Sequence, residues 1–206
     1  MTIEIQQKTS NGLRLVPLET VMLSNRRIFV DGVIDPQAAN DFFKQILYFN
    51  DDDSSQPIDV FFNSMGGEIN SGLLMYDAMQ SSCVPIRTYC MGMAYSMAAI
   101  LFVAGAPGQR YMLQDSKLML HEPLITNLLG GGTTSSIKRI SDDLSQVKKK
   151  LNHILAIHTG KTEKQIEKMI GGDKDRFFNY EESIEFGLCD GIFGINDVMK
   201  GRYSNG

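Results

Sequence analysis

The sequence predicts an α/β fold in which strands and helices alternate along the chain. Three strand-like runs are each followed by a run with helical spacing. The 206 residues, of which 43% are hydrophobic, can bury one substantial core and require no second domain. Because such alternation is typical of parallel strands joined by right-handed crossovers, functional groups are expected at the carboxyl ends of the strands.

The N-terminal part begins with an arm and continues into the first strand-helix unit. Residues 1–20 mix polar and apolar side chains without a period, so we expect an arm with one short strand at most. Residues 27–30 follow as a strand, and Asp35 and Pro36 provide an N-cap and a first-turn proline for a helix. The helix is expected to bury Phe42, Phe43, Ile46 and Leu47.

The next units bring three motifs to one edge of the sheet. Strands are expected at residues 58–62, 85–90 and 117–120, and helices at 70–80 and 96–103. A tight turn at Gly66 and Gly67, the residue Ser96 and the residue His121 each follow or end one of these strands. We therefore expect these segments to converge.

A long amphipathic helix is predicted after the glycines at 130–132. Its apolar positions recur at alternating steps of three and four, which gives a narrow heptad-like stripe: Ile137, Ile140, Leu144, Val147, Leu151, Ile154 and His158. Such a stripe is compatible both with packing inside its own subunit and with contact to a second subunit. The pattern alone leaves both alternatives open.

The C-terminal part contains two motifs of the capping-box type. Thr162 and Asn179 each precede a short predicted helix, and the segment 171–177 between these helices is expected to be a loop. Residues 192–193 suggest a final strand, and residues 201–206 are expected to form a frayed tail.

Composition and charge argue against several classes of protein. A net charge of −4 and a pI near 5.4 leave no basic stripe for a nucleic acid. No apolar run is long enough to span a membrane and the first residues carry no export signal, so we expect a cytoplasmic protein. The cysteines are odd in number and lack metal-ligand spacing, which favours reduced thiols over disulfides or a zinc site: Cys83, Cys90 and Cys189.

Ser96 is the candidate nucleophile. It lies between a strand and a helix, and Ala94 and Ala98 supply the small side chains that a sharp strand-to-helix turn needs two positions away. The first amides of the helix would face an oxyanion formed beside the hydroxyl. A helix N-cap is the alternative, because a serine often satisfies these amides without any chemistry.

His121 is the best candidate for the base that a serine nucleophile requires. It ends a strand at the same edge as Ser96, whereas His153 and His158 lie on the long helix. Spacing does not select the carboxylate that would orient the imidazole, since five acidic residues are possible: Asp115, Glu122, Asp173, Asp175 and Asp190.

The backbone amides of Gly67 and Met97 are candidates for an oxyanion hole beside Ser96. An ordinary tight turn is the alternative for the glycine pair. Cys90 is a weaker candidate for the nucleophile, since it lies inside a strand with no turn to present it and no nearby positive charge.

A set of ordered motifs runs through nearly the whole chain: NSMGG at 63–67, YDAM at 76–79, CMGMAYSMAA at 90–99, LMLHEPL at 118–124, HTG at 158–160 and DRF at 175–177. In this order the motifs resemble the family of the proteolytic subunit of the Clp protease (ClpP), a self-compartmentalising serine peptidase of the crotonase-like superfamily. The resemblance implies a crotonase-like fold of repeated strand-helix units with a protruding handle helix. It also implies a triad of Ser96, His121 and Asp175, with oxyanion-hole amides on Gly67 and Met97.

The resemblance further implies the substrate. Unfolded polypeptides would be cleaved into short peptides through an acyl-enzyme. The substrate would lie extended like an added strand, with contacts at Gly66, Glu68, Ile69, Leu124 and Ile125. No metal or organic cofactor is implied. ATP would be hydrolysed by a AAA+ Clp unfoldase, because this chain has no Gly-rich Lys-Ser/Thr phosphate loop.

Members of the family stack two heptameric rings around a chamber and dock an unfoldase at each end. Residues 1–20 would then line the entrance, and residues 21–200 would form one peptidase domain with a handle at about 122–160. The rings would meet through Ile140, Leu144, Val147, Asp173 and Lys174. Lysine at position 174 replaces the arginine that the family often has, which removes a bidentate fork.

Three residues beside the chemistry depart from the family pattern. Met65 replaces a proline, Tyr95 a small residue and Glu122 a glutamine. Glu122 would either favour the charged form of His121 or point into solvent, and we expect solvent. The departures keep a second hypothesis open, a weakly active or inactive structural paralogue that assembles mixed rings. An acyl-CoA enzyme of the same superfamily is a third hypothesis, but it leaves the Ser-His pair without a role.

Overall fold

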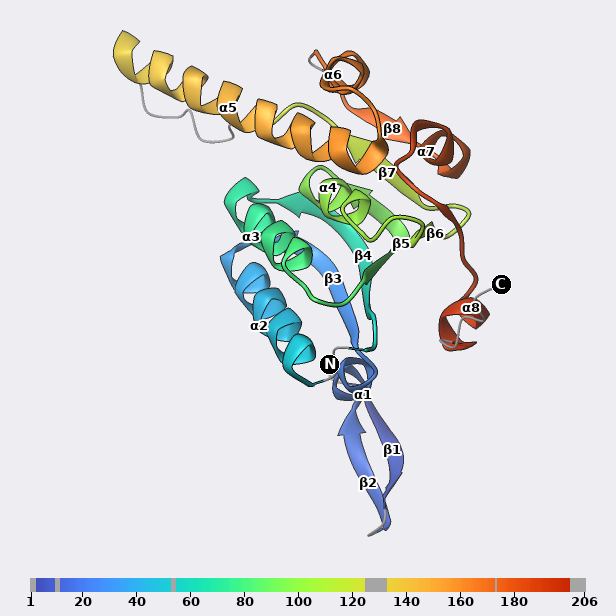
Figure 1. Cartoon of the computed structure of the whole chain (residues 1–206). Coiled ribbons are helices and arrows are strands. Elements are labelled where there is room, and N and C mark those ends of the chain that lie inside the picture. The colour runs from blue at the N-terminus through green and yellow to red at the C-terminus, as the bar shows by residue number, and fades with distance from the viewer. Residues whose placement is uncertain (1–2, 10–11, 53–54, 125–132, 173, 201–206) are drawn as a thin grey trace.

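A seven-stranded sheet forms the centre of the computed structural model, which describes residues 3–9, 12–52, 55–124, 133–172 and 174–200 (Figure 1). Five strands pair in parallel in this order: β3 (Arg27–Ile34), β4 (Ile58–Gly67), β5 (Ile86–Tyr95), β6 (Arg110–Met112) and β9 (Gly191–Ile192). β7 (Lys117–Leu120) pairs in parallel with the end of β5, and β8 (Arg176–Phe178) pairs with β7 in the antiparallel sense. The predicted alternating α/β fold is confirmed, with β8 as an antiparallel addition.

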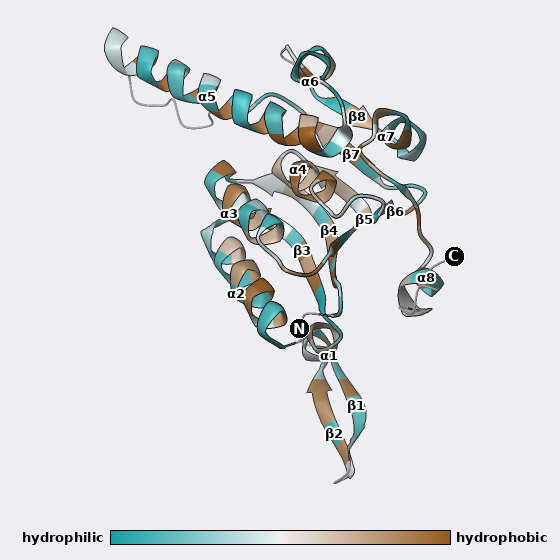
Figure 2. Ribbon diagram, viewed as in Figure 1, coloured by the Kyte–Doolittle hydropathy of each residue, from teal (hydrophilic) through white to brown (hydrophobic). Residues whose placement is uncertain are grey.

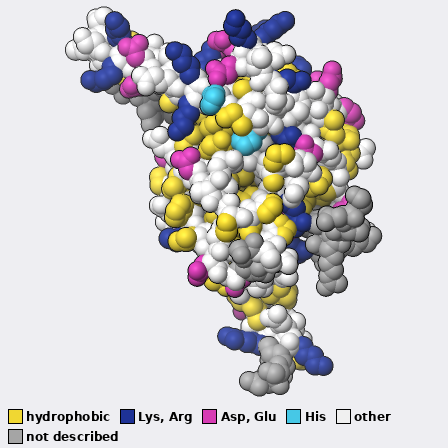
Figure 3. All heavy atoms as spheres, viewed as in Figure 1, with side chains coloured by type: hydrophobic (Ala, Val, Ile, Leu, Met, Phe, Trp, Pro, Cys, Tyr) yellow, Lys and Arg dark blue, Asp and Glu magenta, His cyan; other side chains and the backbone are white. Residues whose placement is uncertain are grey.

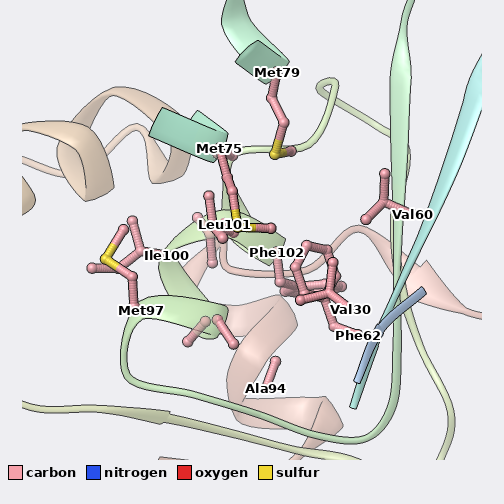
Figure 4. Packing of buried hydrophobic residues seen from close by; sticks show 14 of the residues in the cluster. Val30, Val60, Phe62, Met75, Met79, Ala94, Met97, Ile100, Leu101 and Phe102 are labelled. Carbon is pink, nitrogen blue, oxygen red and sulfur yellow. The ribbon is translucent and has the colours of Figure 1, made fainter. Parts of the chain in front are cut away.

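Helices cover one face of the sheet and form the main core with it. α2 (Pro36–Asp52), α3 (Ile69–Gln80) and α4 (Met97–Val103) lie side by side on that face (Figure 1). Every residue of α4 is buried, and Phe102 packs edge-on against Phe62 at a ring-centroid distance of 6.4 Å (Figure 4). Because side chains alternate along a strand, the opposite face carries a second cluster, of Phe61, Tyr89 and Phe193. Because α4 is enclosed by the core, Ser96, the residue directly before it, is held in place.

The core face of α2 differs from the prediction. Its buried residues are Ala39, Phe42, Ile46 and Phe49, at steps of three, four and three. Phe43 is 41% and Leu47 62% exposed, so their predicted burial is wrong. Each of the two follows a buried residue by one position, which places it at the side of the buried stripe. The predicted N-cap is confirmed, since Asp35 Oδ1 accepts the amide of Ala38 at 2.8 Å.

The long helix α5 (Thr134–Thr159) confirms the predicted amphipathic segment. Its C-terminal half packs on the body of the protein through the buried residues Leu151, Ile154 and Leu155. Its N-terminal half projects beyond the sheet, where its surface is mainly hydrophilic and carries both basic and acidic side chains (Figures 1, 2 and 3). Ile137 on this half is 53% exposed. The inner part of the stripe therefore packs within the subunit, while its outer part is available for another contact.

The N-terminal arm contains two strands rather than the one at most that we expected. β1 (Glu4–Thr9) and β2 (Gly12–Pro17) form an antiparallel hairpin, which α1 (Leu18–Ser24) joins to β3. The hairpin stands away from the sheet (Figure 1). Its strands are mostly exposed, and the alternation of Ile5, Leu13 and Leu15 with polar neighbours extends over only a few positions, too few for two strands to have been predicted.

The C-terminal part is more regular than predicted. Both capping boxes are confirmed, at Thr162 before α6 (Glu163–Ile170) and at Asn179 before α7 (Tyr180–Phe186). β8 occupies part of the expected loop, and β6 and α8 (Ile195–Lys200) were not predicted. These elements are short and lack a period of their own. The expected tail, residues 201–206, lies outside the described residues. Within the described part of the chain, no helix is both long and apolar enough to cross a membrane.

Candidate active site

Ser96 lies at a sharp turn between β5 and α4. Its backbone has φ 53° and ψ −123°, a left-handed φ that is rare for a residue other than glycine. The Ser96 amide donates to Met119 O of β7 at 2.8 Å, which fixes the turn against the sheet. The Ser96 side chain makes no capping hydrogen bond to α4. The alternative of a simple helix cap is therefore wrong, and the hydroxyl is available for another partner.

That partner is His121. Its Nε2 lies 2.7 Å from Ser96 Oγ, which confirms that the two residues meet at one edge of the sheet. The pairing of β5 with β7 brings them together, because Tyr95 is registered with Met119 and each strand ends within two residues of these positions. The structure therefore brings a serine hydroxyl into hydrogen-bond contact with an imidazole.

The two other histidines lie elsewhere. His153 is exposed and its Nδ1 contacts Glu163 Oε1 at 2.8 Å. His158 is half-buried at the end of α5, where its Nε2 lies 3.2 Å from the hydroxyl of Tyr76. Burial, followed by the charge of Arg110, lowers the pKa of His158. His158 therefore packs at the end of the apolar stripe, whereas His153 is exposed.

The third candidate of the triad is not in contact with the base. Asp175 is exposed, and His121 Nδ1 is buried without a hydrogen-bond partner among the described residues. The backbone nevertheless brings the two close: Leu120 of β7 is registered with Arg176 of β8, and the next residues beyond this antiparallel pair are His121 and Asp175. The two residues thus follow directly on the last registered pair of the ladder, with no hydrogen bond from Nδ1 to Asp175.

The diglycine turn packs directly against the serine turn. Gly66 has φ +92°, and a Cβ on it would lie 2.6 Å from Tyr95 O and 3.0 Å from Met97 N. Ser64 Oγ holds the turn, because it donates to Gly32 O at 2.5 Å and accepts the amide of Gly66 at 3.0 Å. We had assigned Ser64 no role, although a serine two residues before a glycine is a signal for such a side-chain bond.

The two predicted oxyanion amides lie on either side of the same junction. The amide of Glu68 donates to Ile34 O of β3 at 2.8 Å. Successive amides of a strand point to opposite edges, so that of Gly67 points away from β3 and toward the β5 side, where Ser96 lies. Met97 is the first residue of α4, and a first-turn amide has no partner within its own helix.

The side chain of Met97 anchors this amide in the core. It is 2% exposed and fills the place where a Cβ of Gly72 on α3 would lie. A glycine at this point of α3 is therefore required by the close approach of α4.

A cavity of ≈ 560 Å³ opens beside Ser96 and His121. The predicted substrate contacts Glu68, Ile69 and Leu124 line it. Gly66 belongs to the diglycine turn but does not line the cavity, and Ile125 lies outside the described residues. Its deeper wall is mostly apolar and comes from α4, α5 and α6: Met97, Ile100, Leu151, Asn152, Leu155 and Ile170.

Asn152 is a buried polar residue in this apolar wall, 6% exposed. We had not predicted that residues of α5 would contribute to the cavity. The heptad stripe predicts which side of the helix is buried, but it does not predict that this side lines a cavity.

The environment of Glu122 contradicts the prediction. Rather than pointing into solvent, its Oε1 accepts hydrogen bonds from Lys148 Nζ at 2.7 Å and from the amide of Gly172 at 3.0 Å. Both bonds lower the pKa of Glu122, that from Lys148 the more. The partners lie 26 and 50 residues away in sequence, so no local pattern could have indicated them.

The other departures from the family pattern have distinct environments. The ring of Tyr95 packs edge-on against Phe177 of β8 at a centroid distance of 5.6 Å, which ties β8 to the serine turn. Met65 is 69% exposed. Of the predicted ring contacts, Ile140, Leu144 and Val147 are partly exposed and Lys174 is exposed. Asp173 lies outside the described residues.

The cysteines offer no rival nucleophile in this cavity. Burial raises the pKa of Cys90 to about 12 and that of Cys189 to about 11, so neither is a thiolate at neutral pH. Cys83 is exposed and hydrogen-bonds to Asn50. Among the described residues, no group of three or more His, Cys, Asp or Glu side chains is arranged to hold a metal ion.

Comparisons with known proteins show what the chain as a whole is similar to. A family model described as Clp protease matches residues 10–196. The chain is also similar to a protein named ATP-dependent Clp protease proteolytic subunit 1 from Salinibacter ruber (strain DSM 13855 / M31), with 37% identity over 207 residues, which cover 98% of this chain and 86% of that protein.

Proposed function

Because this chain belongs to the Clp protease family and is a serine-type peptidase of the Clp class, we propose that Ser96 and His121 carry its chemistry. The observation that carries the proposal is the 2.7 Å contact between Ser96 Oγ and His121 Nε2, at a turn that leaves the hydroxyl uncapped. A serine-type peptidase needs such a pair, because a neutral hydroxyl is a weak nucleophile without an adjacent base. An acyl-CoA enzyme has no need of it.

The reaction follows from the positions of these atoms. His121 Nε2 accepts the proton of Ser96 as Oγ attacks the carbonyl carbon of the scissile bond. The protonated imidazole then donates to the leaving nitrogen, and the C–N bond breaks to leave an acyl-enzyme on Ser96. A water molecule, deprotonated by the same Nε2, hydrolyses the ester and restores the hydroxyl.

The amides of Gly67 and Met97 would stabilise the oxyanion that forms in both steps. Two features support this role: the amide of Gly67 points toward the β5 side, and that of Met97 belongs to the first turn of α4. The side chain of Met97 is locked in the core, so its amide is held in place before the substrate binds.

Asp175 is the carboxylate that we propose to orient His121. Its support is the ladder of β7 and β8, in which His121 and Asp175 follow the registered pair Leu120 and Arg176. A turn of the Asp175 side chain toward His121 would supply an acceptor for the unpartnered Nδ1. The imidazole would then keep the tautomer in which Nε2 is the base.

The cavity suggests how a polypeptide binds. An extended substrate would run past Glu68, Ile69 and Leu124, with the side chain before the scissile bond in the ≈ 560 Å³ cavity. Gly66 would contribute indirectly, by fixing the diglycine turn. Ile125, the residue after Leu124, is proposed to contact the same substrate. The apolar lining favours cleavage after apolar residues.

We further propose an assembly of two stacked heptameric rings that works with a AAA+ Clp unfoldase in the cytoplasm. The unfoldase would hydrolyse ATP and supply unfolded polypeptides, and the peptidase chemistry itself would use no metal or organic cofactor. The projecting N-terminal half of α5 supports a handle between rings, because Ile140 and Leu144 are partly exposed there. Val147 follows them on the stripe and is also partly exposed, although it packs against the core as well. Asp173 and Lys174 are proposed to contribute to the same interface.

A second candidate function is a weakly active or inactive subunit in mixed rings. One observation favours it, the unpartnered Nδ1 of His121. Both candidates are tested on one sample by measuring particle mass, hydrolysis of fluorogenic peptides and labelling by a fluorophosphonate.

We expect the purified chain to hydrolyse peptides and to be labelled at Ser96. Ser96→Ala should abolish both, and His121→Ala should lower both by at least about 10³-fold. A particle of full mass that neither cleaves nor becomes labelled would favour the structural subunit, and labelling at another residue would contradict the assignment of Ser96.

A further inference from the structure

Glu122 joins three segments of the chain next to the active site. It directly follows His121, and its Oε1 accepts hydrogen bonds from Lys148 on α5 at 2.7 Å and from the amide of Gly172 after α6 at 3.0 Å. Lys148 Nζ also lies 3.5 Å from Glu167 of α6. The side chains of Glu122 and Lys148 are 31% and 27% exposed, so the pair is largely shielded by the segments that it connects.

The backbone of the tethered segment has little freedom at its start. The amide of Gly171 donates to Glu167 O at 2.7 Å, which docks this residue on the end of α6. A Cβ on Gly171 would overlap that carbonyl. The next residue, Gly172, gives its amide to Glu122. The chain therefore leaves α6 in a fixed direction, and the carboxylate of Glu122 binds the amide of Gly172 directly after it.

The two anchors of the segment that carries Asp175 lie on either side of His121. Gly172 is held by Glu122, the residue after the base. Arg176 is paired with Leu120, the residue before the base. Asp175 lies between these anchors in sequence and directly precedes Arg176, so its backbone follows the registered pair at the end of the β7–β8 ladder, as that of His121 does on the other strand.

We propose that Glu122 is a positioning residue of this enzyme, which acts by holding Gly172 and so keeping Asp175 within reach of His121 Nδ1. The inference rests on the proposed role of Asp175. A direct effect on the imidazole is not needed, because the carboxylate of Glu122 is engaged by Lys148 and Gly172. An ionised carboxylate suits the task, since its charge-assisted bonds to an ammonium group and an amide are stronger than neutral ones.

The test uses the assembled full-length protein and four single variants. Glu122→Ala removes both bonds, whereas Glu122→Gln keeps an acceptor for the amide of Gly172. Asp175→Ala removes the residue that is positioned. Glu167→Ala is the matched control, because it removes the other carboxylate beside Lys148 without touching Gly172. Sedimentation establishes that each variant keeps the wild-type particle mass.

Hydrogen exchange is the first readout and does not depend on activity. We expect the amide of Gly172 to exchange at least about tenfold faster in Glu122→Ala than in the wild type, because that amide loses its acceptor. Glu122→Gln and Glu167→Ala should stay within about threefold of the wild type. Unchanged exchange in Glu122→Ala would overturn the tether, whatever the catalytic role of Asp175.

A double-mutant cycle on peptide hydrolysis is the second readout. Glu122→Ala should lower kcat by about 10- to 100-fold with little change in KM, because a displaced orienting group impairs the chemistry more than binding. In the Asp175→Ala background the same change should cost less than about twofold. An undiminished loss in that background would mean that Glu122 acts otherwise, and would overturn the inference.

The two readouts also separate this inference from the proposed function. If Asp175→Ala retained wild-type activity while Glu122→Ala loosened Gly172, the tether would stand but its catalytic purpose would be refuted. If the wild type were not labelled at Ser96, the proposed chemistry would be refuted. Hydrogen exchange at Gly172 would still test the contact between Glu122 and Gly172.

Discussion

The main chain of Gly66 lies so close to the carbonyl of Tyr95 that a Cβ on Gly66 would be 2.6 Å from that oxygen. Gly66 belongs to the diglycine turn at the end of β4, and Tyr95 is the last residue of β5, directly before Ser96. The contact explains why the turn and the nucleophile keep a fixed geometry. It also makes the turn sensitive to a single methyl group.

Gly66→Ala should therefore impair catalysis without preventing assembly. The added Cβ must push Tyr95 and Ser96 away, and a displacement of about 1 Å costs on the order of 100-fold in rate. Peptide hydrolysis and fluorophosphonate labelling measure this loss. Gly32→Ala is the matched control, because Gly32 has a similar φ of +96° but open space around its Cβ position. Equal losses in the two variants would show that backbone strain, rather than the contact with Tyr95, is responsible.

Replacing Ile140 and Val147 by alanine should weaken the contact between rings. The two residues lie seven positions apart on the apolar stripe of α5 and are partly exposed. Ile140 lies on the projecting half, whereas Val147 also packs against the core of its own subunit, so its truncation carries a cost there as well. Sedimentation should reveal smaller particles, single rings in particular. Asp142→Ala with Lys149→Ala is the control, since both residues are exposed, have the same spacing and leave the net charge unchanged. A double mutant at 140 and 147 with unchanged sedimentation would refute the handle.

Asn152 should influence which residue is accepted before the scissile bond. Asn152→Leu makes the wall of the cavity uniformly apolar, which disfavours a polar tip on the substrate side chain and favours an aliphatic one. We expect the ratio of kcat/KM for leucine over glutamine at that position to rise about tenfold. Matched fluorogenic peptides measure the ratio. Lys150→Leu, on the exposed side of the same helix, should leave it unchanged, and an unchanged ratio in Asn152→Leu would contradict the placement of the substrate.

The residues at strand ends could be predicted because topology alone brings them together. Parallel strands share one carboxyl edge, so Ser96, His121 and Gly67 were expected to converge. The lack of a capping bond from the Ser96 side chain then argued against a simple helix cap, which leaves the nucleophile as our proposal. Asp175 came from the family resemblance alone, and β8, which begins at the next residue, was too short to be predicted.

Contacts between distant segments could not be predicted. Glu122 was expected in solvent because a charged residue at the end of a strand is usually hydrated, and nothing near it in sequence indicated Lys148 or Gly172. Asn152 shows the same limit, since its place on the stripe of α5 predicts burial but not the cavity that it lines. Local patterns thus established the elements, whereas tertiary contacts determined how the site is supported.

His158 should make stability depend on pH near neutrality. Burial, with the charge of Arg110, lowers the pKa of His158 below its ordinary value of 6.5, so the unfolded chain binds the proton more readily than the folded chain. The stabilisation is fully present above about pH 6.5 and is lost as the pH falls through the lowered folded-state pKa. Thermal unfolding between about pH 5 and 7.5 should therefore show a smaller rise in melting temperature for His158→Gln than for the wild type. His153→Gln, which alters an exposed histidine on the same helix, should retain the wild-type rise. Parallel curves for the His158→Gln variant and the wild type would show that this buried imidazole does not contribute to the pH dependence.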